Sequence, residues 1–382
     1  MVSLVAACAP PPITPHAQPQ KAAWEGVNHY LDSVVADGAA PGAVVGVSIA
    51  GRHFFHGTGR LGNDDATRPD SATIYDLASL TKVIGLTTAV MFAVDEGRLT
   101  LDSSVTRYVP AFEHGDSARS AVTIRHLLTH SSGLPAWRPI YRETNDRLDA
   151  LAAVDTTPLD TLPGTRFLYS DLGAIVLTQA VEGAYGTRLD TLLANRVFGP
   201  LALHDTRYLP PAEWMARIAP TENDPWRGRV LRGEVHDENA AGLGGVSGHA
   251  GLFSSARDLV RFGEWLLGGT GSGCSAPPAS LSPPHSAAAF IQRQELPPGS
   301  SRALGWDTPS GESSAGHHFS ARSFGHTGFT GTSIWIDPTR CLVLVLLSNR
   351  VHPSRSNNRW GPVRAGVADR VVAMFGDSVV TP

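Results

Sequence analysis

The spacing of apolar residues changes twice along this chain, and the changes separate its two ends from its middle. Four short apolar runs have the length and composition of strands. They are residues 42–50, 53–59, 332–337 and 341–348. The first two flank Gly51-Arg52 and the last two flank Pro338-Thr339-Arg340, so each pair predicts a hairpin. We expect one antiparallel sheet assembled from both ends of the chain.

Between and beside these strands the apolar residues recur at helical spacing. Predicted helical stretches are 24–36, 79–97, 124–128, 171–182, 189–197 and 359–375, and a Ser/Pro-rich loop covers about 268–284. The pattern predicts an α/β fold of the α+β kind, with an antiparallel sheet flanked by helices and a helical insertion. We expect an α/β domain from residues 23–100 and 255–378, and a mainly helical domain from residues 101–254.

Composition narrows the class of protein. The chain has 382 residues, 42% of them hydrophobic, and a net charge of −4, which is ordinary for a globular protein and leaves no basic surface for nucleic acid. No apolar run reaches the length of a membrane-spanning helix. The three cysteines, Cys8, Cys274 and Cys341, have no metal-ligand spacing and allow at most one disulfide. Nothing in the sequence indicates an oligomeric state.

The N-terminus carries a separate signal. Val5-Ala6-Ala7-Cys8 resembles a bacterial lipobox, and a Pro/Gln-rich stretch to Gln20 follows it. We interpret residues 1–22 as a lipoprotein-signal remnant and tether, with Cys8 as the lipidated residue. This predicts a periplasmic protein that meets the membrane only through that lipid. The alternative is a tail with a chance cysteine, because no basic residue precedes Cys8; a start site placed too far downstream would explain this.

Lys82 is one of only two lysines among 31 basic residues. A chain with this preference for arginine keeps lysine where arginine cannot serve, and lysine differs in being able to lose its proton. It stands three residues after Ser79, and a neutral amine beside a serine hydroxyl is a general base. This is the Ser-x-x-Lys spacing of penicillin-recognising enzymes. The alternative is an ordinary amphipathic helix with a stray serine and lysine.

If the segment that begins at Ser79 is helical, the three-residue spacing of Ser79 and Lys82 has a geometric reason. Residues three apart on a helix have side chains in reach of each other. We expect Asp76 to be the N-cap, which would place Ser79 in the first turn. Backbone N–H groups there lack intrahelical partners, so the N–H of Ser79 is expected to bind a developing oxyanion.

Three further segments stand in an order that resembles the serine β-lactamase and D-alanyl-D-alanine peptidase superfamily. They are residues 123–135 (TIRHLLTHSSGLP), Tyr169-Ser170-Asp171 and His326-Thr327-Gly328. The first is similar to the family's hallmark in the helical region, the second to its Tyr-x-Asn element, and the third to its Lys/His-Thr-Gly element. The resemblance covers about residues 24–375. It implies a β-lactamase/transpeptidase-like fold and a serine acyl hydrolase that needs no cofactor.

The resemblance also implies roles for residues. Tyr169 would hold a proton shared between Ser79 and the leaving group, provided that a nearby cation such as Lys82 lowers its pKa. Thr327 and Gly328 would let a substrate lie along the strand edge, and the N–H of Phe329 would be the second oxyanion donor. The alternatives are a half-buried tyrosine that starts a helix and a histidine, His326, in a surface loop.

Two positions depart from the family pattern. Asp171 stands where many relatives have asparagine, and its carboxylate should keep Lys82 protonated and repel an anionic substrate. His326 replaces the lysine of most class C β-lactamases, so its hold on a substrate carboxylate should be weaker and pH-dependent. Both departures disfavour an efficient β-lactamase.

We therefore predict a D-alanyl-D-alanine carboxypeptidase-like or esterase-like enzyme acting on a small-molecule or peptidoglycan-derived acyl substrate. The alternatives are a class C-type β-lactamase and a penicillin-binding sensor without turnover. Residues 236–239 (HDEN) and His249 could suggest a metal site, but their spacing matches no helical ligand pair, so none is predicted. No Gly-x-Ser-x-Gly elbow occurs, which argues against a doubly wound hydrolase.

Overall fold

The computed structural model describes residues 21–113, 117–275 and 277–375. Its strands are β1 Gly42–Ile49, β2 Arg52–Gly59, β3 Ile74–Asp76, β4 Arg207–Tyr208, β5 Asn223–Asp224, β6 Arg229–Val230, β7 Leu252–Ser255, β8 Phe324–Thr327, β9 Ser333–Asp337 and β10 Leu342–Ser348. Its α-helices are α1 Lys21–Ala36, α2 Thr88–Asp95, α3 Ile124–Leu128, α4 Arg147–Asp155, α5 Asp171–Tyr185, α6 Leu189–Leu193, α7 Glu238–Gly242, α8 Ala256–Gly268, α9 Ala287–Phe290 and α10 Gly361–Val372.

One antiparallel sheet joins the two ends of the chain, as predicted. Its strand order is β2-β1-β10-β9-β8, with the N-terminal β1 paired to the C-terminal β10. Both predicted hairpins form, and β8 is an additional edge strand that the apolar pattern did not predict. The predicted fold class is confirmed.

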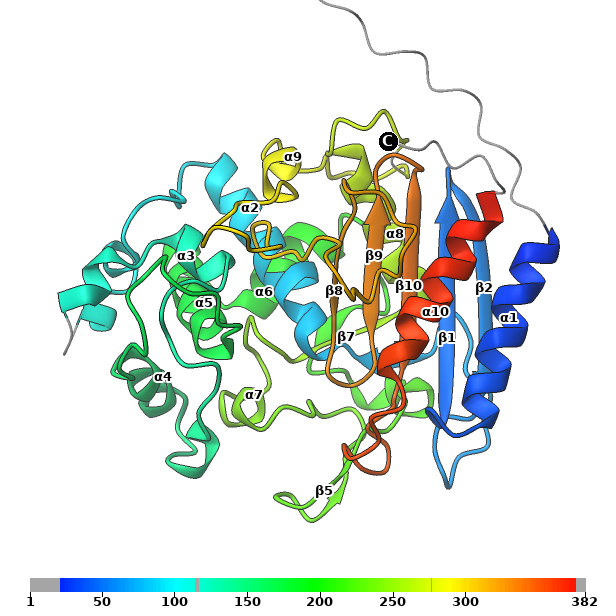
Figure 1. Cartoon of the computed structure of the whole chain (residues 1–382). Helices are drawn as coiled ribbons and strands as arrows, with labels where there is room; N and C mark the ends of the chain where they lie inside the picture. The colour runs from blue at the N-terminus through cyan, green and yellow to red at the C-terminus, as the bar shows by residue number, and fades with distance from the viewer. Residues whose placement is uncertain (1–20, 114–116, 276, 376–382) are drawn as a thin grey trace, which may run out of the picture.

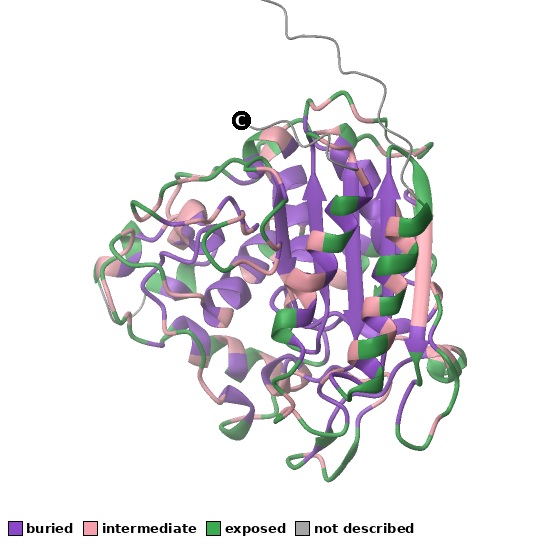
Figure 2. Ribbon diagram, turned by 45° about the vertical axis from the view of Figure 1, so that its right-hand side comes forward, coloured by how far each residue is buried: buried purple, intermediate pink, exposed green. Residues whose placement is uncertain are grey.

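The sheet is buried on both faces because β10 alternates between two cores. Val343, Val345 and Leu347 belong to the core shared with the helical part of the chain. Leu342, Leu344 and Leu346 belong to the core under α1 and α10. Figure 1 shows α1 and α10 side by side on one face of the sheet, and Figure 2 shows their exposed outer surfaces.

Residues of the middle section lie beside this sheet, as cyan and green segments in Figure 1. They include α3 to α7, and also short strands: β3, β7 and β4 form a three-stranded sheet and β5 pairs with β6. The division into an α/β domain and a mainly helical domain stays a prediction.

The helix predicted from Ser79 to Gly97 has a more complex course. A 3₁₀ turn over Ala78–Leu80 leads into a π-helical segment, Lys82–Thr87, which continues as α2. The sequence predicts no apolar segment long enough to span a membrane, but Ala78–Asp95 has the length and hydropathy of such a helix. This segment is mostly buried in the protein's own core. Burial among packed helices accounts for its apolar character.

A disulfide ties the loop after α8 to the β9–β10 hairpin. Cys274 and Cys341 are bonded, and 67 residues separate them. This is the one bond that the three cysteines allow. Cys8 lies outside the described residues, so its predicted lipidation stays a prediction.

Candidate functional site

Ser79 and Lys82 lie where the small three-stranded sheet meets the helical segment. The Nζ atom of Lys82 lies 3.1 Å from Oγ of Ser79, 2.6 Å from Oδ1 of Asp171 and 3.1 Å from the carbonyl oxygen of His249. The lysine side chain is 4% exposed. Three oxygen acceptors therefore fix the ammonium group beside the serine hydroxyl, and the structure brings together Ser79 and Lys82 as the motif predicts.

Asp76 is not the N-cap that the sequence predicts. It ends β3, and the cap position of the following turn is Leu77, which has no side-chain cap bond. The Asp76 carboxylate instead accepts hydrogen bonds from the N–H groups of Ala78 and His236, at 2.8 and 2.6 Å. The chain turns too sharply at Ala78, where φ is +46°, for a regular helix to begin there.

Lys82 carries a proton in this arrangement. Burial lowers its pKa, but the charge of Asp171 and the phenol of Tyr169 more than offset this, so the pKa lies above its usual value. The predicted effect of Asp171 on the lysine agrees with this geometry. For Lys82 to act as a general base it must therefore first lose this proton, against the attraction of the carboxylate 2.6 Å away.

Tyr169 lies against this pair, just before α5. Its ring centroid is 4.9 Å from Nζ of Lys82, 4.4 Å from the His130 ring and 5.9 Å from the His326 ring. Among the described residues its buried hydroxyl has no hydrogen-bond partner. The backbone N–H of Ser170 donates to Nδ1 of His130, which fixes the imidazole behind the phenol. The ring is thus held with its phenol beside the Lys82 ammonium, whose pKa the phenol raises.

The His326-Thr327-Gly328 element lies at the end of β8, with Gly328 directly after the strand. As the edge strand, β8 is paired with β9 on one side, with a single bridge from Asp307 at Gly325 on the other. A Cβ atom at Gly328 would lie 2.4 Å from the carbonyl oxygen of Leu77. Glycine is therefore required for the strand end to pass against the backbone that precedes Ser79.

His326 is uncharged. Its Nδ1 lies 2.8 Å from the carbonyl oxygen of Thr327, so Nδ1 carries the hydrogen and donates it. Burial, with the charges of Arg302 and Lys82, holds the pKa of His326 well below its usual value. The imidazole thus supplies no positive charge for a substrate at neutral pH. The sequence predicts a weak, pH-dependent cation at this position, and the structure shows a neutral side chain.

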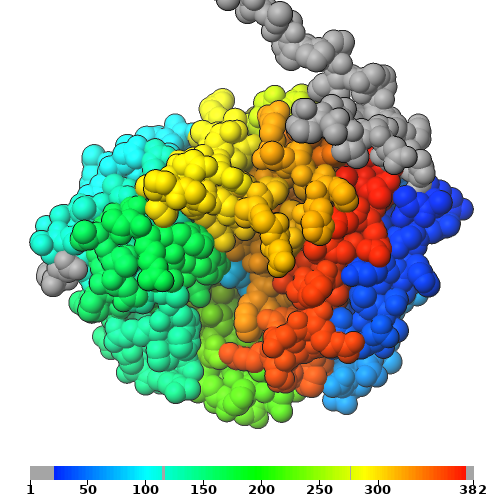
Figure 3. All heavy atoms as spheres, viewed as in Figure 1, coloured from blue at the N-terminus to red at the C-terminus, as the bar shows by residue number. Residues whose placement is uncertain are grey.

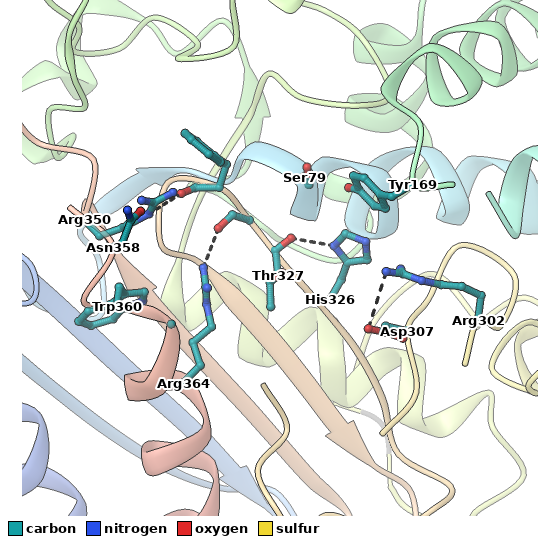
Figure 4. Close-up of a pocket in the computed structure, with 13 residues that line it drawn as sticks. Ser79, Tyr169, Arg302, Asp307, His326, Thr327, Arg350, Asn358, Trp360 and Arg364 are labelled. Atoms are coloured by element: carbon teal, nitrogen blue, oxygen red, sulfur yellow. Dashed lines mark hydrogen bonds and ion pairs between the residues drawn. The ribbon is translucent and has the colours of Figure 1, made fainter. Parts of the chain in front are cut away.

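Three arginines supply that charge instead. A cleft of about 480 Å³ is lined by Ser79, Tyr169, Arg302, Asp307, His326, Thr327, Gly328, Phe329, Arg350, Asn358, Trp360, Gly361 and Arg364. Figure 3 shows a hollow between the green helical part and the orange and red segments, under the yellow one, and Figure 4 shows the cleft's side chains. The sequence prediction considered only His326 as the cation for a substrate carboxylate and did not include these arginines.

The arginines differ in how they are held. Arg364 donates to the carbonyl oxygen of Gly328 at 2.7 Å, and burial together with Arg350 lowers its pKa to about 10. Arg350 donates to the carbonyl oxygen of Phe329 at 2.8 Å. Arg302 lies 3.7 Å from Asp307, and its buried Nε and Nη1 have no partner within the described part of the chain. Arg302 thus differs from Arg350 and Arg364 in donating to no backbone carbonyl among the described residues, although Nε of Arg364 also lacks a partner there.

The histidines of 236–249 are hydrogen-bonded to acidic side chains. His236 lies 2.9 Å from Glu222, and His249 lies 2.8 Å from Asp237 and from Oγ of Ser247. Over the described ranges, no group of three His, Cys, Asp or Glu side chains is arranged to hold a metal ion. The sequence motif thus marks a buried network behind Lys82, whose ammonium bonds to the His249 carbonyl.

Comparison with known proteins gives the family. The family model described as Beta-lactamase matches residues 27–369. The chain belongs to this beta-lactamase family. A putative D-alanyl-D-alanine carboxypeptidase of Salmonella schwarzengrund (strain CVM19633) is 32% identical over 325 residues, which cover 77% of this chain and 73% of the relative. The family and the serine acyl hydrolase class that the sequence predicts are confirmed.

Solved structures with the same fold include enzymes of different activities. EstCE1, a hydrolase with promiscuous acyltransferase activity, has a TM-score of 0.71 and 21% identity, covering 92% of this chain and 98% of its own. A class C beta-lactamase has a TM-score of 0.73 and 18% identity, covering 94% and 97%. At these identities the likeness shows the fold alone.

Proposed function

We propose that this protein is a carboxypeptidase-like serine hydrolase that removes a C-terminal residue from a peptidoglycan-derived D-alanyl-D-alanine peptide through an acyl-enzyme at Ser79. The observation that carries the proposal is the pairing of a Ser79–Lys82–Asp171 cluster with an arginine-lined cleft. A substrate of this class brings a carbonyl to the serine and a terminal carboxylate to the arginines, with which it forms charge-assisted hydrogen bonds. The curated Salmonella relative is named as a putative enzyme of the same kind.

The contacts give a route for the protons. When Lys82 has lost a proton to solvent, Oγ of Ser79 bonds to the substrate carbonyl carbon and its hydrogen passes to Nζ of Lys82 at 3.1 Å. The Asp171 carboxylate at 2.6 Å stabilises the ammonium group that forms. Tyr169 protonates the leaving amine as the C–N bond breaks, and in deacylation it takes a proton from the attacking water. As the ester bond to Ser79 breaks, Lys82 returns the proton to Oγ of Ser79. The N–H groups of Ser79 and Phe329 are the expected donors to the oxyanion.

A second candidate is a class C-type β-lactamase. A β-lactam also carries a carboxylate, and the arginine-lined cleft suits it equally well. A neutral ester, in contrast, has no anionic group for these cations to bind. The arginines thus support the carboxypeptidase and the β-lactamase over the esterase.

The deciding experiment compares three substrates in parallel: an N-acylated D-Ala-D-Ala peptide, a chromogenic cephalosporin and a short-chain nitrophenyl ester. We expect the highest kcat/KM for the peptide, and complete loss of all three activities in Ser79→Ala. Ser280→Ala, in an exposed loop, is the matched control. Faster cephalosporin turnover would replace the proposal by the β-lactamase. Stable labelling of Ser79 by penicillin without release would indicate a sensor.

We also propose that the protein is a periplasmic lipoprotein anchored through Cys8. The Cys274–Cys341 disulfide supports an oxidising compartment. Expression with its native upstream region in a Gram-negative host, followed by labelling with a fatty-acid analogue, tests the anchor. Label in the wild type and its loss in Cys8→Ala are expected; an unlabelled wild type would overturn the proposal.

A further inference from the structure

The Asp76 carboxylate lies at the junction of the two sides of the cleft. It is 2% exposed, and each of its oxygens accepts a different backbone N–H. Oδ1 accepts from Ala78 at 2.8 Å and Oδ2 accepts from His236 at 2.6 Å. Burial raises the pKa of Asp76, opposed by these two hydrogen bonds. Burying a carboxylate costs free energy. We therefore consider what this carboxylate does between the Ala78 and His236 backbones.

One hydrogen bond of Asp76 fixes the backbone that leads into Ser79. Ala78 precedes Ser79 and adopts a φ of +46°, a conformation that residues with a side chain rarely take. The bond from its N–H to Asp76 holds this turn, and the N–H of Leu77 is held in addition by the carbonyl of Leu252 at 2.9 Å. The direction of the Ser79 N–H follows from this backbone geometry.

The other bond leads to the opposite donor. The His236 ring stacks on the Phe329 ring, with centroids 5.7 Å apart and planes inclined by 26°. Arg350 lies 4.5 Å from the same ring and donates to the Phe329 carbonyl at 2.8 Å. The position of Phe329, and with it of its N–H, thus depends on the His236 backbone that Asp76 holds.

The main chain around Asp76 strengthens the same link. The Asp76 carbonyl accepts from Oγ1 of Thr330 at 2.7 Å, and the Leu77 carbonyl accepts from Oγ1 of Thr332 at 2.9 Å. The main-chain carbonyls of residues 76 and 77 therefore bond directly to the turn that holds Phe329, while the Asp76 carboxylate bonds to Ala78 and His236.

We propose that Asp76 is a positioning residue that sets the separation of the two oxyanion donors, the N–H groups of Ser79 and Phe329. This inference rests on the proposed acyl-transfer function. Asp76 touches neither substrate nor nucleophile; it acts through Ala78 on one donor and through His236 and Phe329 on the other. Because the donors stabilise the tetrahedral oxyanion and not the planar carbonyl, the effect falls on kcat and leaves KM unchanged.

Asp76→Asn is the decisive variant. Asparagine keeps the shape, but its amide NH₂ group must face one of the two backbone N–H donors, so one bond is lost. We expect kcat for p-nitrophenyl acetate to fall about 10–100-fold, below the roughly 10²–10³-fold cost of deleting a donor outright. KM should stay within about twofold. The affinity for phenylboronic acid, whose serine adduct places an oxygen in the oxyanion site, should fall in parallel with kcat.

Asp258→Asn is the matched control, since Asp258 is also buried and accepts a backbone N–H, from Asp205 at 2.7 Å, without lining the cleft. Its kcat and boronate affinity should be unchanged whatever its melting temperature. A second variant, His236→Ala, keeps the backbone bond to Asp76 and removes the ring under Phe329, so a smaller loss of kcat at constant KM is expected.

Unchanged kcat and boronate affinity in both Asp76→Asn and His236→Ala would overturn the inference, as would equal losses in Asp258→Asn. If Asp76→Asn does not fold, His236→Ala decides alone by the same readouts. A wild type that neither turns over the ester nor reacts with a fluorophosphonate would overturn the proposed function, and this inference with it.

Discussion

The Asp171 carboxylate lies 2.6 Å from the ammonium nitrogen of Lys82, closer than the Ser79 hydroxyl at 3.1 Å. The lysine side chain is almost fully buried, so the carboxylate acts on it with little screening by water. The resting site therefore holds a charged lysine, and acylation requires that the proton first leave it. The ease of that transfer should set the pH range of activity.

Asp171→Asn should move the pH profile of kcat/KM towards acid. The pKa of Lys82 is raised in the wild type because Asp171 and Tyr169 outweigh burial. A raised lysine pKa means that the neutral amine forms only at higher pH. Removing the carboxylate leaves burial as the main influence, so the pKa falls and the neutral amine forms at lower pH. We expect the ascending limb of the profile to shift down by at least about one pH unit.

Asp237→Asn is the comparison for this experiment, because Asp237 also acts on Lys82 through its charge but does not contact it. Its shift should have the same sign and be smaller. An unchanged profile in Asp171→Asn would show that another ionisation, and not that of Lys82, controls the rate.

Lys82→Arg should be almost as damaging as Lys82→Ala. Arginine keeps the charge but does not give up its proton at accessible pH. The guanidinium is also too large for a site where one nitrogen bonds to Ser79, Asp171 and the His249 carbonyl together. We expect a loss of about 10²–10⁴ in kcat/KM, the usual cost of removing a general base. Near-normal turnover by a folded Lys82→Arg protein would show that only the charge is required.

The spacing of apolar and turn-forming residues predicted those strands and helices whose formation depends mainly on neighbouring residues. The strands β1, β9 and β10 are buried runs of mostly apolar residues between turn-forming residues, and two-sided burial selects for such runs. The helix α3 has the predicted bounds, since Thr123 caps it through a bond from the His126 N–H. The grouping of Ser79, Lys82, Tyr169 and Asp171 followed from resemblance, which carries long-range information that periodicity lacks.

The rest depended on contacts between distant segments. Arg302, Arg350 and Arg364 line the cleft, but in a chain whose basic residues are nearly all arginine nothing local distinguishes them from surface arginines. β8 is only four residues long and contains Gly325, so its strand character comes from pairing with β9. Asp76 was taken for a helix cap because its bond to the distant His236 cannot be read from neighbouring residues.

The Cys274–Cys341 disulfide should contribute to stability without affecting the chemistry. It closes a loop of 67 residues, and the chain-entropy estimate for a loop of that length is about 4 kcal/mol. We expect the Cys274→Ser, Cys341→Ser double variant to lose about 2–4 kcal/mol of unfolding free energy in urea titrations under non-reducing conditions. Neither cysteine lines the cleft, so kcat and KM should be retained. A changed KM would show that the disulfide shapes the cleft.

Arg302→Gln should weaken recognition of a substrate carboxylate selectively. Its guanidinium lies 5.5 Å from the Tyr169 ring centroid and has buried nitrogens without partners among the residues described. A charge-assisted hydrogen bond to a carboxylate contributes about 2 kcal/mol, or roughly 30-fold in kcat/KM. We expect a loss of that order for a peptide with a free C-terminal carboxylate, and at most about threefold for the same peptide as its C-terminal amide or for a neutral nitrophenyl ester. Arg293→Gln is the matched control, because Arg293 bonds to Thr308 and does not line the cleft. Equal losses on charged and neutral substrates would show that Arg302 instead supports Tyr169 and His326 by packing.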